Sequence, residues 1–173
     1  KSYTVEMIHE LAKSMGKFNP YWLEEPLLPE EHQSYKDLRQ KGFVKVATGE
    51  HEQEYEGFED LASLQATDFL QMDVCCQGGF EMGLKVFDLA AAHKMKFAFH
   101  SWGTMLEVLA AAQLGVCREE SVVEWLEYPC YSSPGKAGMY PFPLSDEILK
   151  ERLEIKNGYL KLPSGNGLGM EVN

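Results

Sequence analysis

The sequence repeats one short pattern, in which an apolar run of strand character ends at an ionisable residue and a segment with helical spacing follows. The ionisable residues are Glu24, Glu50, Asp73, His100 and Glu127, and successive ones lie roughly 25 residues apart, about the length of one βα unit. Strands that alternate with helices predict a parallel sheet. We therefore expect an α/β fold made of about five βα units of a TIM-like (β/α) barrel, incomplete in this chain, with these side chains around one mouth.

Hydrophobic periodicity sets the expected boundaries of the elements. Apolar residues recur with helical spacing between Thr4 and Gly16, for example, and the glycine ends that helix. The expected helices are 4–16, 31–40, 55–64, 78–91 and 105–114, and the expected strands are 21–23, 43–47, 69–72, 96–99 and 122–126.

The amino-acid composition changes at Tyr128, after which proline, glycine and aromatic residues are frequent. We expect residues 1–127 to form the partial barrel and residues 128–173 to form a C-terminal tail that packs on it. Within this tail, the pattern predicts a short acidic helix at 146–153, a turn at Asn157-Gly158 and a final extended segment.

The formal net charge of −11 disfavours two kinds of partner. Proteins bind nucleic acids mainly through Lys and Arg side chains, which neutralise the phosphates. Anionic membrane surfaces likewise attract positively charged side chains. No apolar run approaches the ~20 residues that a transmembrane helix needs. The four cysteines include adjacent Cys75 and Cys76 but lack the Cys-x-x-Cys spacing of zinc sites. We expect free thiols in a reducing cytoplasm.

The residue types at the strand ends suit proton transfer beside a metal ion. The carboxylate oxygens of Glu24 and Glu50 are ligands that Mg²⁺ prefers. Asp73 could orient the imidazole of His100 from the neighbouring strand, so that His100 acts as general acid or base near neutral pH. Glu127 could donate a hydrogen bond to a substrate oxygen if burial keeps it protonated. This set suits abstraction of a proton next to a carboxylate.

Four motifs in order resemble the mandelate racemase/muconate lactonizing enzyme branch of the enolase superfamily, and rhamnonate-type acid-sugar dehydratases in particular. The motifs are Trp22-Leu23-Glu24-Glu25-Pro26, Ala47-Thr48-Gly49-Glu50-His51, Gln71-Met72-Asp73 followed by Gly78-Gly79, and Phe99-His100-Ser101-Trp102-Gly103. The resemblance covers essentially the whole chain and implies strands 4 to 8 of the family's barrel. Met72 stands where relatives often have proline.

The resemblance also implies roles for individual residues. It implies an Mg²⁺-dependent lyase that acts on a small acid-sugar carboxylate and forms a homo-oligomer at full length. By this resemblance, Glu24 and Glu50 match two of the three metal ligands, and Asp73 and His100 match the acid/base dyad. Glu127 matches the hydrogen-bond donor to the substrate carboxylate. Glu25 would support the ligands from behind, Trp102 would form a pocket wall and His51 would contact the substrate.

Several parts of the family pattern have no match in this sequence. These are the first metal ligand (an aspartate), a lysine base one strand earlier, the first barrel strands and the N-terminal capping domain. We therefore expect the 173-residue polypeptide, by itself, to be inactive.

Three alternatives remain open at this point. The first is a racemase or epimerase of the same superfamily, which begins with the same proton abstraction. The second is a catalytically inactive barrel fragment with a structural or interaction role. The third is a zinc hydrolase that uses His51, His93 and His100, although their spacing fits no zinc-ligand pattern.

Overall fold

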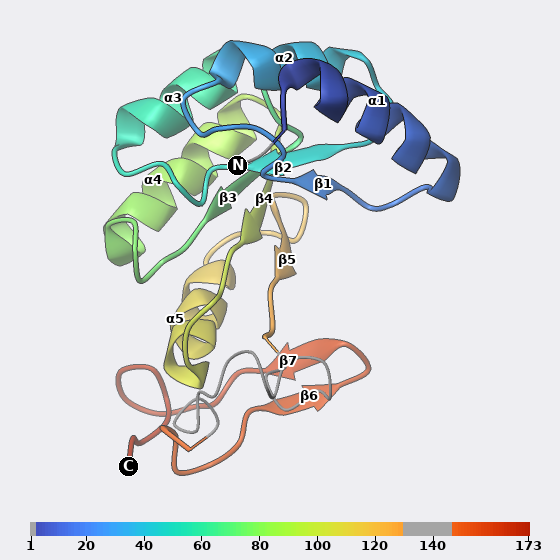
Figure 1. Cartoon of the computed structure of the whole chain (residues 1–173). Helices are drawn as coiled ribbons and strands as arrows, with labels where there is room; N and C mark the ends of the chain where they lie inside the picture. The colour runs from blue at the N-terminus through green and yellow to red at the C-terminus, as the bar shows by residue number, and fades with distance from the viewer. Residues whose placement is uncertain (1–2, 130–146) are drawn as a thin grey trace.

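The computed structural model describes residues 3–129 and 147–173 and places one five-stranded sheet at the centre of the molecule (Figure 1). The elements, in chain order, are α1 (Val5–Met15), η1 (Gly16–Phe18), β1 (Leu23–Glu24), α2 (His32–Gln40), β2 (Val46–Thr48), α3 (Tyr55–Ser63), β3 (Phe69–Met72), α4 (Gly79–Ala92), β4 (Lys96–Phe99), α5 (Met105–Gly115), β5 (Val123–Leu126), β6 (Glu154–Lys156) and β7 (Tyr159–Lys161).

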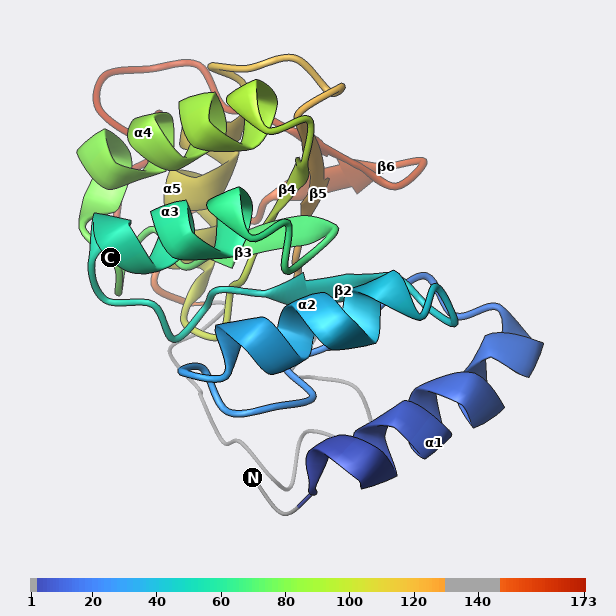
Figure 2. The same cartoon turned by 90° about the horizontal axis from the view of Figure 1, so that it is seen from above.

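The central sheet is parallel throughout, and its strands follow in the order β1-β2-β3-β4-β5. Consecutive strands are therefore neighbours, each joined to the next by a helix. The sheet curves, and α2, α3 and α4 lie along its outer side (Figure 2). The predicted α/β fold is thus present, with five parallel strands and a helix after each of the first four in the described residues, and the carboxyl ends of β1 to β5 share one edge.

Successive strand residues point to opposite faces of the sheet, and this alternation separates two layers of packing. On the helix side, Leu70 and Met72 of β3 belong to the large buried core, together with side chains from α2 to α5. On the inner side, Phe69 packs with Ala47, Ala98 and Trp22. This side also brings the two edge strands together, because the ring of Tyr21, before β1, lies 5.5 Å from the ring of Trp125 on β5. The inner side of the sheet is thus packed around Phe69, whereas Tyr21 and Trp125 at its margin stay about half exposed.

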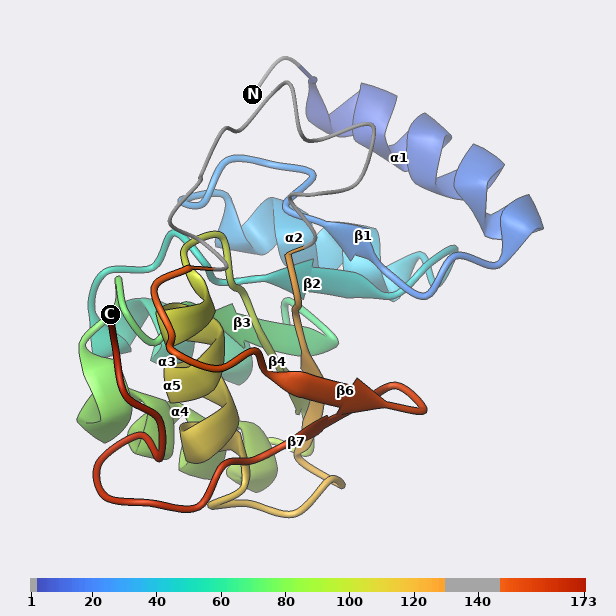
Figure 3. The ribbon, with the colours of Figure 1, turned by 90° about the horizontal axis from the view of Figure 1, so that it is seen from below.

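The C-terminal residues lie beside α5 (Figure 3). Leu149 is buried with Met105, Val108 and Leu109 of α5. Gln113 of α5 donates hydrogen bonds to the carbonyl oxygens of Pro163 and Leu168, at 3.4 and 2.9 Å. The tail therefore contacts the last helix through one apolar cluster and one polar link.

The predicted helix at 146–153 is wrong for the part of it that the structure describes. Residues 147–153 form turns, bends and an antiparallel bridge between Leu149 and Val172. A segment this short gains little from helix formation in isolation, whereas the bridge allows Leu149 to be buried against α5. The predicted turn at Asn157-Gly158 is confirmed, since both residues have positive φ and join β6 to antiparallel β7.

Strand boundaries shift by a few residues from the prediction. β1 covers Leu23–Glu24 rather than 21–23, and β2 covers Val46–Thr48 rather than 43–47. Tyr21 lies before β1, because the backbone pairing with β2 begins at Leu23, opposite Val46. Cys75, Cys76 and Cys117 are free and exposed, whereas Cys130 lies outside the described residues. No helix within 3–129 or 147–173 is both long and apolar enough to cross a membrane.

Replacing Leu149 with alanine tests whether the tail folds together with the sheet. Leu149 is only 4% exposed, so we expect Leu149→Ala to lower the free energy of unfolding by about 2–4 kcal/mol in urea titrations. Ile155→Ala is the matched control, because Ile155 on β6 is 48% exposed and its truncation should cost less than about 1 kcal/mol. Equal small effects of both substitutions would mean that the tail contributes nothing to the cooperative unit.

Candidate active site

The five strand-end residues of the sequence analysis lie at the common edge of the sheet. Glu24 is the last residue of β1, and Glu50, Asp73, His100 and Glu127 follow β2 to β5 within two residues. His100 Nδ1 lies 2.8 Å from Glu50 Oε2 and 3.3 Å from Glu127 Oε2. Donor atoms of Glu24, Glu50 and His100 all lie within 4.8 Å of one another. Residues far apart in sequence thus meet at one site, as parallel strand ends require.

His100 is surrounded by carboxylates that favour its charged form. Burial alone would lower the pKa of the imidazole, but the carboxylates of Glu50, Glu127 and Asp73 outweigh burial and raise the pKa to about 9. His100 therefore carries a proton at neutral pH in the metal-free protein. It can give that proton as an acid, and it becomes a base when a cation offsets the neighbouring negative charge.

Asp73 influences His100 through its charge rather than through a hydrogen bond. Its side chain accepts hydrogen bonds from the backbone N–H groups of Cys75 and Cys76, at 2.8 and 3.0 Å. These bonds close the turn that follows β3 and fix the carboxylate, which is 5% exposed. The expected direct contact between Asp73 and His100 is not formed in this structure, where the imidazole contacts Glu50 instead.

Glu127 is fixed by the loop that carries His100. Its Oε2 atom accepts a hydrogen bond from the backbone N–H of Ser101, at 2.8 Å. Burial raises the pKa of Glu127, and although the Ser101 N–H and His100 lower it, the pKa stays above its ordinary value. A raised pKa makes the protonated form more accessible, which is the form that donates a hydrogen bond.

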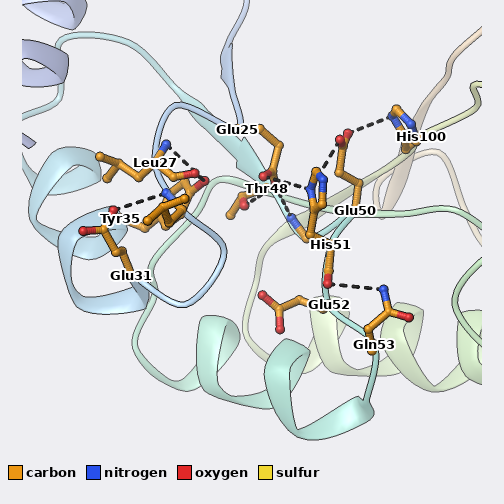
Figure 4. Close-up of polar contacts among 12 residues, drawn as sticks. Glu25, Leu27, Glu31, Tyr35, Thr48, Glu50, His51, Glu52, Gln53 and His100 are labelled. Atoms are coloured by element: carbon orange, nitrogen blue, oxygen red, sulfur yellow. Dashed lines mark hydrogen bonds and ion pairs between the residues drawn. The ribbon is translucent and has the colours of Figure 1, made fainter. Parts of the chain in front are cut away.

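Glu25 stabilises the loop that carries Glu50 and His51. Its Oε1 atom accepts hydrogen bonds from the Thr48 hydroxyl and from the backbone N–H of Gly49, the latter at 3.0 Å (Figure 4). His51 Nδ1 lies 3.3 Å from Glu25 and 3.5 Å from Glu50, with the imidazole half exposed. Glu25 therefore lies behind the Glu50 loop, and His51 lies at its solvent-facing side.

Glu107 was missed by the sequence analysis. It lies in the first turn of α5, is 8% exposed, and accepts a hydrogen bond from the backbone N–H of Trp102 at 2.8 Å. Burial, followed by the charge of Asp73, raises the pKa of Glu107 to about 7. The pattern Thr104-x-x-Glu107 is that of a capping box, and this signal could have identified the residue. Trp102 itself is partly exposed beside the site.

The donor atoms present fit a divalent cation in part. Glu24 and Glu50 offer hard carboxylate oxygens, which suit Mg²⁺. His100 Nδ1 is buried close to Glu50 without being aligned for a hydrogen bond, and His100 forms one cluster of donor atoms with Glu24 and Glu50. The zinc alternative gains no support, because His93 caps the end of α4 and joins no cluster of ligands within 3–129 and 147–173.

Comparison with known proteins identifies the family. The family described as Enolase C-terminal domain-like matches residues 1–173. The chain belongs to this family. The predicted resemblance to the enolase superfamily and to a partial barrel of this type is confirmed.

Enzymes that act on acid sugars and their lactones are among its relatives. L-rhamnonate dehydratase of Saccharopolyspora erythraea is 35% identical over 172 residues, which cover 98% of this chain and 41% of the relative. D-galactarolactone cycloisomerase of Agrobacterium fabrum is 31% identical over 177 residues, which cover 99% of this chain and 44% of the relative. This enolase-family chain thus spans less than half the length of these relatives.

The solved structures place the same chain in the same fold. A crystal structure from Labrenzia alexandrii, assigned to the mandelate racemase/muconate lactonizing enzymes, superposes with a TM-score of 0.83 at 26% identity. The match covers 99% of this chain and 42% of that one. The five parallel strands of the enolase-family chain, with the helices between them, therefore correspond to the C-terminal part of that protein.

Glu107 predicts a specific dependence of stability on pH. Its pKa rises from 4.5 to about 7 on folding, so the folded protein keeps the proton longer than the unfolded chain, and stability falls as the pH rises from 4.5 to 7. Glu107→Gln removes this loss. We expect the variant to gain on the order of 2 kcal/mol relative to the parent between pH 5 and pH 8, measured by urea unfolding.

The control for the change in net charge is Glu59→Gln, on the exposed side of α3. A difference between Glu107→Gln and the parent that stays constant with pH would show that Glu107 titrates alike in the folded and unfolded states.

Proposed function

We propose that the protein containing this chain abstracts the proton next to the carboxylate of an acid sugar and eliminates the β-hydroxyl, so that a sugar acid becomes a 2-keto-3-deoxy acid. The observation that carries this proposal is the contact of His100 with both Glu50 and Glu127, three residues that follow three different strands. The relatives named above, a rhamnonate dehydratase and a galactarolactone cycloisomerase, support the substrate class.

Each residue of the site has a part in this proposal. His100 moves the proton, and Asp73 adds the negative charge that keeps the imidazole basic. Glu127 donates a hydrogen bond to the substrate carboxylate from its protonated form. Glu24 and Glu50 hold Mg²⁺, which when bound supplies positive charge to stabilise the negative charge that develops on the substrate.

His51 and Trp102 line the solvent-facing side of the site in this proposal. His51 is half exposed next to Glu50, and Trp102 follows His100 on the same loop. Both can reach a ligand that enters from the carboxyl ends of the strands. Glu25 supports the site indirectly, because it accepts a hydrogen bond from the Gly49 backbone and does not face the open side.

We favour dehydration over racemisation because an L-rhamnonate dehydratase is among the relatives and because His100 can serve in turn as base and as acid. Both reactions begin when a base takes the α-proton. A racemase then returns a proton to the α-carbon, whereas a dehydratase delivers a proton to the departing hydroxyl, which leaves as water. Once His100 has taken the α-proton, it holds a proton that it can deliver to the departing hydroxyl.

A screen of acid sugars tests the proposed function. The gene product that contains this chain, supplied with Mg²⁺, should form a 2-keto acid from at least one sugar acid, detected as its semicarbazone. His100→Asn should lower kcat by about 10²-fold or more, because proton transfer by a positioned side chain contributes this much. Gln113→Leu, in α5 and remote from the strand ends, should leave kcat unchanged.

The outcome of the screen separates the alternatives. An epimer without a keto product would favour the racemase, and full activity of His100→Asn would contradict the proposal. The 173-residue polypeptide by itself should give no turnover, because β1 and β5 each pair on one side only within the described residues and two carboxylates hold Mg²⁺ weakly.

A further inference from the structure

Gln77 joins the loop after β3 to the loop after β2. It is 1% exposed, and its Oε1 atom accepts a hydrogen bond from the backbone N–H of Asp73 at 2.7 Å. Its Nε2 atom donates to the carbonyl oxygens of Gly49, at 2.7 Å, and of Glu52. One buried side-chain amide thus binds backbone groups on both sides of Glu50 and the backbone of Asp73.

The turn after β3 does not need this side chain to close. The backbone N–H of Gln77 donates to the carbonyl oxygen of Asp73 at 3.0 Å, and the Asp73 side chain binds the N–H groups of Cys75 and Cys76. These bonds already define the turn. The distinctive contribution of the Gln77 amide is therefore the link across to the neighbouring strand end.

The backbone of the loop after β2 is tightly confined at Gly49. Gly49 has φ of +130°, and a Cβ atom at this position would lie 2.5 Å from the carbonyl oxygen of Gln71 on β3. Its N–H donates to Glu25, and its carbonyl oxygen accepts from Gln77. Side chains from the segments after β1 and after β3 thus bind the backbone N–H and the carbonyl oxygen of the residue that precedes Glu50.

We infer that Gln77 is a positioning residue that fixes Glu50 relative to Asp73. It touches neither the proposed metal nor the substrate, and it acts by binding the backbone that carries each group. Glu50 must stay within reach of both Glu24 and His100 for the site to work, and a loop bound from one side only would let its carboxylate move away. This inference rests on the proposed function, since it takes Glu50 as a metal ligand and Asp73 as a member of the acid/base pair.

The chemistry of the glutamine explains why this residue suits the position. A primary amide offers an acceptor and two donors in one plane, and here the acceptor faces an N–H group while the donors face two carbonyl oxygens. A leucine of similar size satisfies none of these groups. A glutamate keeps an acceptor for Asp73 N–H but turns a second oxygen toward two carbonyl oxygens, so it breaks only the link to the Glu50 loop.

The test measures Mg²⁺ binding by the gene product that contains this chain, by isothermal titration calorimetry, alongside thermal unfolding. Gln77→Leu and Gln77→Glu should each weaken Mg²⁺ binding by about tenfold or more, as loss of a residue that orients a metal ligand does. Gln113→Leu is the matched control, because Gln113 also donates to two backbone carbonyl oxygens but lies at the tail. It should lower the melting temperature and leave the Mg²⁺ dissociation constant within about twofold.

The opposite result overturns the inference. If both Gln77 variants fold and bind Mg²⁺ within about twofold of the parent, Gln77 has only a structural role that Gln113 shares. Should Gln77→Leu fail to fold, Gln77→Glu alone decides the question, because it keeps the bond to Asp73.

A metal-free measurement separates this inference from the proposed function. If the parent protein itself does not bind Mg²⁺, the proposed metal site fails, and the link is then judged from the backbone amide signal of Asp73 in NMR spectra. Glu50→Gln should shift this signal in the parent and lose most of that effect in the Gln77→Glu background. An equal shift in both backgrounds would show that Gln77 does not connect the two strand ends.

Discussion

The parallel pairing of β1 to β5 in chain order is the constraint on which the site depends. Because every strand runs in the same direction, each βα unit returns the chain to the same end of the sheet, and each strand finishes at the same edge. The alternation of side chains then sends Leu70 and Met72 to the helices and Phe69 to the inner layer. The polar residues that follow the strands lie at this edge, beyond both apolar layers.

Crowding of negative charge governs the chemistry at this edge. His100 is held between Glu50 and Glu127, and its pKa is raised, while burial raises the pKa of Glu127 and Glu107. All three pKa values are raised, because a buried site crowded with carboxylates favours the protonated form of each group. A divalent cation between Glu24 and Glu50 would relieve the same excess, and proton release on metal binding follows from this competition.

The sequence predicts the fold and the strand-end residues because both depend on periodicity. Apolar runs and helical spacing repeat along the chain, and the ionisable residue after each strand is visible without knowledge of its neighbours. The family motifs around Glu24, Glu50 and His100 strengthened the same interpretation. The match of the whole chain to an enolase family bears out that part of the analysis.

The contacts inside the site were less predictable, because they depend on loop geometry. Asp73 was expected to orient His100, yet its carboxylate binds the amides of its own turn. Gln77 and Glu107 escaped notice because a glutamine in a turn and a glutamate in a first helical turn are common on surfaces. Only the tertiary structure shows that each is buried and bound to a loop of the site.

The pKa of the His100 imidazole, measured by NMR in the absence of metal, tests most directly whether these strand ends form one site. Convergence of β2, β4 and β5 predicts a pKa of about 9 in the parent protein. It also predicts a fall toward the ordinary value near 6.5 in Glu50→Gln, because the closest carboxylate is then neutral. A pKa near 6.5 in the parent that Glu50→Gln leaves unchanged would contradict the account, since it would place His100 and Glu50 apart.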